Sequence, residues 1–339
     1  MPRSRNSGIY DRFERHAHRT FGEAAARYLA EYDGKTKSRA AQSIDAVTPY
    51  IAHLPLIDVD DEALQQFKED RKHGRGPFVD KHGEPMPAMV GTINKDLTQV
   101  VTILNKAAKV YRWIPLVPMI QHVKGPRKQP YPFTWEEQDR LFSHLPTGWD
   151  CGVALFAVNT GCRREEIFGL KWTDRQWVPE LDIKTPDGFV KERMYVFVLR
   201  DTKNGEQRAV ICNSIARRAV EYQRKWQEKH GQTEYVFPTR FTGQKPSKVR
   251  SAGVVWDRAW KAAGLPSGPL VKRGIHNCRH TAGHRLRAVG CPQEDRDAIL
   301  GHKKASLSQH YATEALERLL EWAEKITIRK EMTILRAVG

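Results

Sequence analysis

The sequence predicts a mainly α-helical protein of two domains, the second of which is mixed α+β with a small antiparallel sheet. The chain has 339 residues, which exceeds the usual size of one hydrophobic core. From about Phe21 to Trp113, and over much of the second half, apolar residues recur at three- and four-residue spacing, as on the buried side of helices. Two later segments, RMYVFVLR and RAVIC, are rich in β-branched and aromatic residues, which favours paired strands.

An excess of basic residues makes the chain a candidate nucleic-acid-binding protein. It contains 56 Lys and Arg against 40 Asp and Glu, a formal net charge of +16. The cations are spread along the whole chain, which predicts a folded basic surface and not a disordered basic arm. Charge alone leaves open a basic protein with an unrelated activity.

Several other classes of protein are disfavoured. The longest clean apolar run, from Val153 to Val158, is far shorter than the roughly 18 residues of a membrane span. The basic N-terminus has no apolar stretch of the signal-peptide kind, so we expect a cytoplasmic protein. The five cysteines have no regular spacing, which indicates reduced structural thiols and neither a disulfide framework nor a thiolate zinc site.

The first half is expected to form a helical domain over residues 21–122, after a basic N-terminal segment over 1–20. This short segment leaves little room for a further DNA-binding domain. The stretch from His73 to Thr92 interrupts the helical period with four glycines and three prolines. It predicts a long loop or a small hairpin between two pairs of helices.

A change in composition separates the two expected domains. Residues 123–133, VKGPRKQPYPF, carry three prolines and three basic residues without a helical period, as interdomain linkers do. Thr134 then precedes Glu137 by three residues, and an apolar pattern follows, which predicts a capping box at the start of a helix. We expect a second domain over 134–326 and a C-terminal tail over 327–339.

Within the second domain the two apolar strands are separated by DTKNGEQ. Its Asn204-Gly205 pair suits a tight turn, so Lys203 is placed near the tip of a β-hairpin. Helical periodicity covers much of the remainder, in four segments over residues 215–229, 254–263, 277–289 and 314–326.

The first of three segments that could carry chemistry is NTGCRREEIFGLKW, residues 159–172. Gly161 is expected to end one helix, and Arg163 to begin the next one close to the core. Glu166, one turn further, is either the plain ion-pair partner of Arg163 or a support that leaves Arg163 facing a phosphate. Taken alone, the pair favours the plain salt bridge.

The second segment, GIHNCRHTAGH, spans residues 274–284. It repeats histidine at every fourth position, which would stack imidazoles on one helical face and invites a metal-site interpretation: His276, His280 and His284. Arg279 argues against a metal ion, because its fixed charge next to a histidine opposes a divalent cation. The H-x-x-R pair of His276 and Arg279 decides nothing by itself, since the pattern recurs elsewhere in the chain.

The third segment, LGHKKASLSQHYA, spans residues 300–312. Gly301 is expected to end a helix, with His302 directly after it and Tyr311 at the start of the last amphipathic helix. Considered alone, a tyrosine is far more often a core aromatic than a nucleophile.

The order of these features resembles the tyrosine recombinase, or phage integrase, family of site-specific DNA recombinases. TGCR, a hairpin lysine, H-x-x-R, LGH and a tyrosine nine residues later follow one another over residues 134–326. Carried over residue by residue, the resemblance implies a catalytic set and one supporting glutamate: Arg163, Lys203, His276, Arg279, His302 and Tyr311, with Glu166 as the support. Cys162 and Arg164 depart from the commoner residues of the family without affecting this set.

The resemblance implies that DNA is cut and rejoined through a 3′-phosphotyrosyl bond, with a free 5′-hydroxyl and with no cofactor, metal ion or ATP. Negative charge builds up on the nonbridging oxygens during such a transfer, and Arg163 and Arg279 can bind these oxygens bidentately. His276 is expected to accept or relay the tyrosine proton, and Lys203 to protonate the leaving oxygen. His302 would bond a phosphate oxygen.

The family also implies a SAM-like helical core-binding domain in the first half, and a homotetramer on double-stranded DNA that carries specific recombination sites. Accessory proteins that set direction or bend DNA are further partners, in a bacterial or phage-derived, nucleoid-associated setting. Candidate DNA-contacting residues in the first domain are Lys35, Lys37, Arg39, Lys95 and Lys106; each could equally be an ordinary solvated cation.

Two alternatives to a recombinase remain open at this point. One is a catalytically silent DNA-binding protein of the same fold, and the other is a type IB topoisomerase-like enzyme. The complete ordered set speaks against a silent protein.

Overall fold

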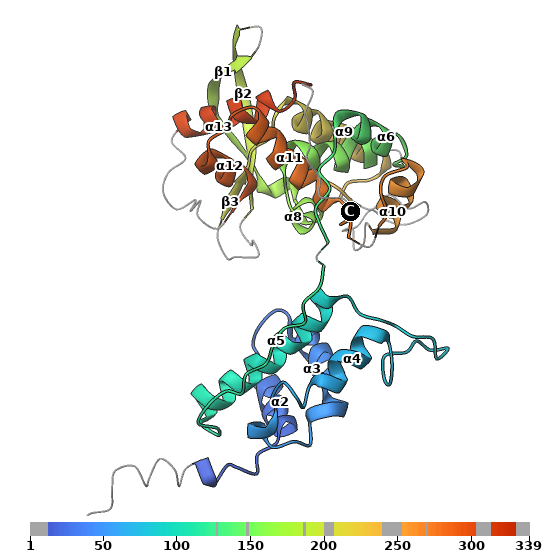
Figure 1. Cartoon of the computed structure of the whole chain (residues 1–339). Coiled ribbons are helices and arrows are strands. Elements are labelled where there is room, and N and C mark those ends of the chain that lie inside the picture. Colours follow the sequence, from blue (N-terminus) through green and yellow to red (C-terminus); the bar gives the residue numbers. More distant parts are fainter. Residues whose placement is uncertain are drawn as a thin grey trace, which may run out of the picture. The chain divides into compact units, whose positions relative to one another are not determined.

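The computed structural model describes residues 13–126, 128–146, 149–185, 188–199, 207–238, 253–268, 270–302 and 313–329; for 149–151, 179–185, 188–193, 313 and 314 it describes the backbone alone. The chain divides into two compact units, Met1–Arg127 and Lys128–Gly339. Helices dominate both units, and a small antiparallel sheet lies in the second (Figure 1). The predicted mainly α class is confirmed.

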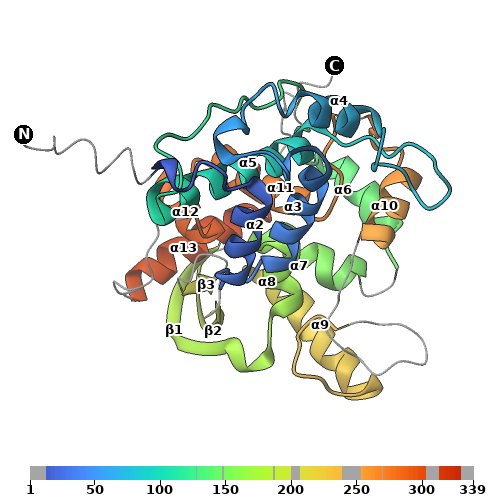
Figure 2. The same ribbon diagram turned by 90° about the horizontal axis from the view of Figure 1, so that it is seen from below.

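The first unit is a group of helices around one apolar core. Its elements are α2 (Phe21–Ala30), α3 (Lys37–Ile51), η1 (Leu56–Asp58), α4 (Gln65–His73), α5 (Val90–Lys106) and the π-helical turn η2 (Ala107–Tyr111). Helix α3 packs against α2 and α5, and the three lie side by side in Figures 1 and 2. Fully buried side chains such as Phe21, Phe67 and Leu97 fill the space between the helices.

The predicted interruption after α4 is the smaller of the two expected forms, a hairpin. Helix α4 ends at Gly74, whose φ of 67° is the left-handed conformation that glycine tolerates best. An antiparallel bridge then joins Val79 and Pro85. Phe78 at the base of this hairpin packs against Phe67 in the core.

The second unit holds the remaining elements. They are α6 (Trp135–Ser143), the π-helical turn η3 (Trp149–Ala154), α7 (Leu155–Thr160), α8 (Arg164–Gly169), η4 (Trp172–Asp174), β1 (Arg175–Thr185), β2 (Gly188–Leu199), β3 (Arg208–Val210), α9 (Ser214–His230), α10 (Gly253–Ala262), α11 (His276–Ala288), α12 (Gln293–Leu300) and α13 (Thr313–Lys325). The capping box that opens α6 is confirmed, since Thr134 and Glu137 exchange hydrogen bonds. The four helices predicted from periodicity correspond to α9, α10, α11 and α13.

The sheet has the strand order β1-β2-β3, with both pairs antiparallel. Strands β2 and β3 are the predicted hairpin, whose tip with Lys203 lies outside the described residues. Strand β1 was not predicted. Its register against β2 is irregular between Trp177 and Glu180, where Pro179 cannot donate to the ladder. This proline and the charged residues after it conceal the strand in the sequence.

The sheet lies between two apolar clusters, because successive side chains of a strand point to opposite faces. On one face Tyr195 and Phe197 join the core around α7, α9 and α10. On the other face Met194 and Val196 join the core built by α11, α12 and α13, and Figure 1 shows α12 and α13 beside the sheet. Both apolar clusters therefore pack on the same strands, one on each face of the sheet.

The first residues of the second unit, before α6, are part of its core. Tyr131 and Phe133 are buried, and their backbone N–H groups donate to Asn277 Oδ1 and Thr281 Oγ1 on α11, at 3.0 and 2.9 Å. Helix α11 is thereby held in place by the first residues of the second unit. Among the described residues, no helix combines the length and the apolarity needed to cross a membrane.

Candidate active site

The turn between α7 and α8 places Arg163 at the edge of the core. Helix α7 ends at Gly161, with a φ of 62°, and a Cβ atom at this position would lie 2.4 Å from Leu300 Cδ2, so only glycine fits. Arg163 is the N-cap of α8. Its backbone N–H donates to Glu166 Oε2 and its Nη1 donates to Glu166 Oε1, both at 2.7 Å. The predicted Arg163–Glu166 ion pair is thus present.

Helix α11 brings in Arg279 from the other side. This arginine is only 6% exposed, and its Nη1 donates to two backbone carbonyls, those of Gly161, at 2.8 Å, and Leu300. Burial, with the charges of Arg163 and Arg208 nearby, lowers the pKa of Arg279 to about 10. The guanidinium therefore keeps its charge at neutral pH.

The end of α12 is the common anchor of these groups. The last carbonyls of a helix have no intrahelical partner and carry the negative end of the helix dipole, so cations are favourable there. Each of three successive carbonyls accepts a hydrogen bond from a different arginine: Ile299 from Arg208, Leu300 from Arg279 and Gly301 from Arg163. Three segments far apart in the sequence therefore meet at one helix end.

Glu166 lies between two of these arginines. Its carboxylate accepts from Arg163 Nη1 at 2.7 Å and from Arg208 Nη1 at 2.6 Å, and it is almost fully buried. Burial opposes its ionisation, but the charge of Arg208 and the hydrogen bonds from Arg163 outweigh this effect and lower the pKa of Glu166. One buried carboxylate thus aligns two guanidinium groups.

His302 follows directly after Gly301, which ends α12 with a φ of 68°. Its Nδ1 lies 2.7 Å from Asp297 Oδ1, and its backbone N–H donates to the carbonyl of the same residue at 2.9 Å. The contact at Nδ1 orients the ring and leaves Nε2 on its opposite side.

Two histidines of α11, His276 and His280, are neutral near pH 7. His276 keeps part of its ring exposed, yet desolvation and the charge of Arg279 lower its pKa. The pKa of His280 falls to about 4, chiefly through burial. The two rings meet edge to face with centroids 4.8 Å apart. In the part of the chain that the structure describes, no group of three histidine, cysteine or carboxylate side chains is placed to hold a metal ion.

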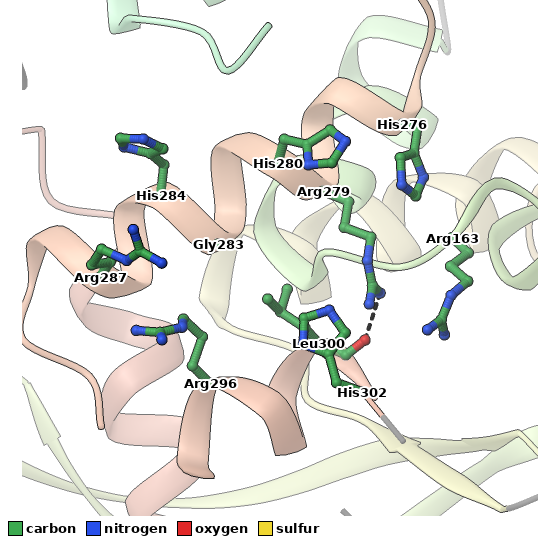
Figure 3. A pocket seen from close by; sticks show the side chains of 10 residues that line it. All are labelled: Arg163, His276, Arg279, His280, Gly283, His284, Arg287, Arg296, Leu300 and His302. Carbon is green, nitrogen blue, oxygen red and sulfur yellow. Dashed lines mark hydrogen bonds between the residues drawn. The ribbon is translucent and has the colours of Figure 1, made fainter. Parts of the chain in front are cut away.

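These residues surround one cavity of about 420 Å³ (Figure 3). It is lined by Arg163, His276, Arg279, His280, Gly283, His284, Arg287, Arg296, Leu300 and His302. No aspartate or glutamate is among these lining residues. The cavity therefore suits an anion, and a strongly charged one.

Four of the six predicted catalytic residues line this cavity: Arg163, His276, Arg279 and His302. Glu166 does not line the cavity and accepts a hydrogen bond from Arg163. Lys203 and Tyr311 are outside the described residues.

The candidate DNA-contacting residues of the first unit differ among themselves. Lys106 Nζ lies 3.1 Å from Glu31 Oε2 and 5.3 Å from the centroid of the Tyr28 ring, so it takes part in contacts within the unit. The other four are exposed: Lys35, Lys37, Arg39 and Lys95.

Several residues of the site escaped the sequence analysis. Arg208 looks like an ordinary basic residue after a hairpin, and Asp297 like an ordinary surface acid of a helix. Arg287 could have been found, because Arg279, Gly283 and Arg287 are spaced by four and therefore share one face of α11.

Fold and site together define a two-unit, mainly α-helical protein with an arginine-lined cavity for an anion. The model of the Phage integrase family matches residues 133–318, which is more than half of the 339-residue chain. The chain belongs to the phage integrase family.

Two kinds of relatives are similar to this chain. The Integrase of Salmonella phage P22 is 25% identical over 262 residues, and the match covers 76% of this chain and 62% of that protein, less than two thirds of its length. A lambda integrase dimer bound to a COC′ core site has a similar fold, with a TM-score of 0.57, 17% identity and coverage of 84% of this chain and 95% of that chain. The Tn1549 transposon integrase in complex with circular intermediate DNA gives a TM-score of 0.59 at 16% identity, over 84% of this chain and 92% of that one.

We expect Glu166→Gln to destabilise the protein by about 3–5 kcal/mol at pH 7, because the buried Arg208 and the partly buried Arg163 lose their carboxylate. The pKa of Glu166 is lower in the folded protein than its ordinary value of 4.5. The stabilisation is therefore complete above that value and is lost as the pH falls through the lowered pKa. Urea denaturation of both proteins between pH 7 and pH 3 measures the difference, which should shrink in acid.

The matched control is Glu165→Gln, which removes an exposed carboxylate paired only with its neighbour Arg164. Its effect should stay within about 0.5 kcal/mol. Equal effects of the two substitutions at pH 7 would contradict the importance of the buried carboxylate.

Proposed function

We propose that the chain is a site-specific DNA recombinase, an integrase, that cuts and rejoins DNA strands through a covalent bond to Tyr311. The observation that carries the proposal is the carboxylate-free cavity, in which Arg163 and Arg279 are held by backbone carbonyls. Arg279 is anchored by backbone carbonyls alone, and Arg163 shares a single carboxylate, that of Glu166, with Arg208. The cluster therefore keeps a net positive charge that is available to a phosphodiester. The family and its ordered motif support the same reading.

The two arginines hold the scissile phosphate. A guanidinium has five N–H donors, and Arg279 uses only its Nη1 on Gly161 and Leu300. Its Nε and Nη2 remain for the nonbridging oxygens. Donors fixed before the reaction stabilise the charge that develops there without reorganisation, which is the largest contribution in many enzymes.

The covalent step exchanges one phosphodiester for another. The hydroxyl oxygen of Tyr311 attacks phosphorus, and the bond from phosphorus to the 5′-oxygen breaks. His276, neutral at physiological pH, accepts or relays the tyrosine proton, and Lys203 donates a proton to the leaving 5′-oxygen. His302 bonds a phosphate oxygen. The products are a 3′-phosphotyrosyl bond and a free 5′-hydroxyl, and the reverse reaction rejoins the strand; no step uses a metal ion or ATP.

Recombination exchanges four strands, so we propose a homotetramer on two duplexes that carry specific recombination sites. A lambda integrase tetramer bound to a Holliday junction has a similar fold, with a TM-score of 0.55 and 17% identity over 91% of this chain and 84% of that chain. In our proposal the first unit binds the core of the site, and Lys35, Lys37, Arg39 and Lys95 are its candidate phosphate contacts. We propose that the reaction takes place on DNA in the cytoplasm. Accessory proteins that set direction or bend the DNA would assist it.

A nicked suicide duplex that carries the recombination site tests the proposal. Wild type is expected to form a protein–DNA adduct that resists SDS, and Tyr311→Phe to form none. Tyr235→Phe, a tyrosine outside the cavity, is the matched control and should form the adduct normally. No adduct with wild type, or an equal amount with Tyr311→Phe, would refute the proposal. Resolution of paired sites without relaxation of plasmid DNA separates a recombinase from a topoisomerase.

We expect the rate of adduct formation to fall in acid. His276 can accept a proton only when it is neutral, and its pKa is lowered from its ordinary value of 6.5. The rate should therefore be constant above about pH 6.5 and decrease below it, following the lowered pKa. His276→Gln should be about 10²- to 10⁴-fold slower and should lose this acid limb. Single-turnover rates of both proteins from pH 5 to pH 8 test this prediction. If the variant kept the same decrease in acid, the decrease would be due to the titration of another group.

Arg208→Lys should slow adduct formation about 10- to 100-fold, as is typical when a residue that orients reacting groups is lost. Lysine keeps the charge but cannot bind Glu166 and the carbonyl of Ile299 at once in the planar geometry of arginine. The affinity for the duplex should change little, because Arg208 does not line the cavity. Binding and single-turnover rates are measured together, and loss of binding alone would contradict a positioning role.

A further inference from the structure

The cavity continues beyond the residues that the proposed reaction uses. Arg279, Gly283 and Arg287 line it along one face of α11. The eight residues between the two arginines correspond to about 12 Å of helix, at roughly 1.5 Å per residue. One phosphate group held by Arg163 and Arg279 therefore leaves the region of Arg287 unoccupied.

A second arginine meets Arg287 from the neighbouring helix. Arg296 projects from α12, and Figure 3 shows the guanidinium groups of Arg287 and Arg296 at the same end of the cavity, away from His276 and Arg163. Gly283 lies between the two ends and has no side chain that could divide them. A Cβ atom added at this position would lie 3.3 Å from Leu300 Cδ1. The two ends thus belong to one continuous cavity.

The charges of this pair are not balanced by the protein. In the described part of the chain, Arg287 has no ion-pair partner, and the contact of Arg296 is a long one, 3.5 Å from Nη1 to the carbonyl of Cys291. Arg224, an exposed arginine elsewhere in the second unit, is by contrast paired with both Glu221 and Glu228. Two unneutralised guanidinium groups that face one space call for an anionic ligand.

We propose that Arg287 and Arg296 form a second phosphate subsite, which binds a phosphate of the cleaved DNA strand within a few nucleotides of the scissile one. This inference rests on the proposed function, because it takes the scissile phosphate to lie at Arg163 and Arg279. Successive phosphates of one strand advance by about 3.4 Å along the duplex axis, so a strand offers an anion at this distance. A single free phosphate cannot occupy both ends.

The second subsite would fix how the strand lies in the cavity. A phosphate held at one point can rotate about it, whereas two points of attachment define the direction of the strand and its register. Contacts of this kind position DNA and carry no sequence information of their own. They bring the scissile phosphorus to a defined place relative to the nucleophile.

The test is a binding cycle with neutral methylphosphonate linkages, placed one at a time on both sides of the cleavage position in a duplex that carries the recombination site. The reference protein is Tyr311→Phe, so that no covalent product forms. One flanking linkage should weaken its binding about 10- to 100-fold, the loss of a charge-assisted contact. When Arg287→Gln and Arg296→Gln are added, the same linkage should cost less than about two-fold, while a neutral scissile phosphate still weakens binding as before.

The matched control adds Arg218→Gln and Arg258→Gln to the reference protein instead. These arginines are exposed outside the cavity, and the control loses the same two charges. It should keep the full penalty at the flanking linkage, which separates a specific contact from general attraction to DNA. Circular dichroism of each variant checks that it is folded.

Three results would overturn the subsite. The first is a flanking penalty that persists without Arg287 and Arg296, and the second is its disappearance in the control as well. The third is unchanged DNA binding together with failure of protomers to assemble, which would assign the pair to an acidic segment of a protein partner. Failure of the proposed function has a different signature: neutralising the scissile phosphate then has no effect in any variant, or wild type binds DNA without forming an adduct.

Discussion

The three hydrogen bonds at the end of α12 are the constraint on which the site depends. A helix leaves its last carbonyls without partners, and here each of three is occupied by an arginine from a different element, β3, α11 or α8. Arginine suits this position because its planar group can bind a carbonyl on one side and still present donors on another. Carbonyl groups at the helix end thus take the place of the carboxylates that usually surround buried cations. Within the described ranges, Glu166 is the one carboxylate that contacts these arginines.

This solution has an electrostatic consequence. Burial of a cation is costly, and the dipole of α12 together with one carboxylate offsets that cost only in part. The lowered pKa of Arg279, about 10, and of His280, about 4, reflect the remaining cost. At neutral pH the fixed charge of the cavity therefore resides on arginines, and His276 and His280 contribute ring nitrogens without charge.

Local sequence signals were sufficient to predict much of the fold and the order of the candidate site residues along the chain. The capping box at Thr134 and the glycines that end α7 and α12 act within a few residues, so the sequence displays them directly. Strand β1 was missed because Pro179 breaks the alternation that identifies strands. The hydrogen bond from Arg163 to Gly301 joins residues 138 positions apart, and a local sequence pattern cannot predict such a long-range contact. The same holds for Arg208, and for Arg296 opposite Arg287.

Helix α12 also has a second set of contacts, along its side. Asp295 accepts hydrogen bonds from Arg318 and Trp322 of α13, and the described part of α13 begins two residues after the proposed nucleophile, Tyr311. Two extended residues span only about 7 Å, so the docking of α13 limits where the tyrosine can reach. A single eight-residue helix therefore anchors the arginine cluster at its end and α13 along its side. A tilt of α12 would therefore displace the arginine cluster and α13 together.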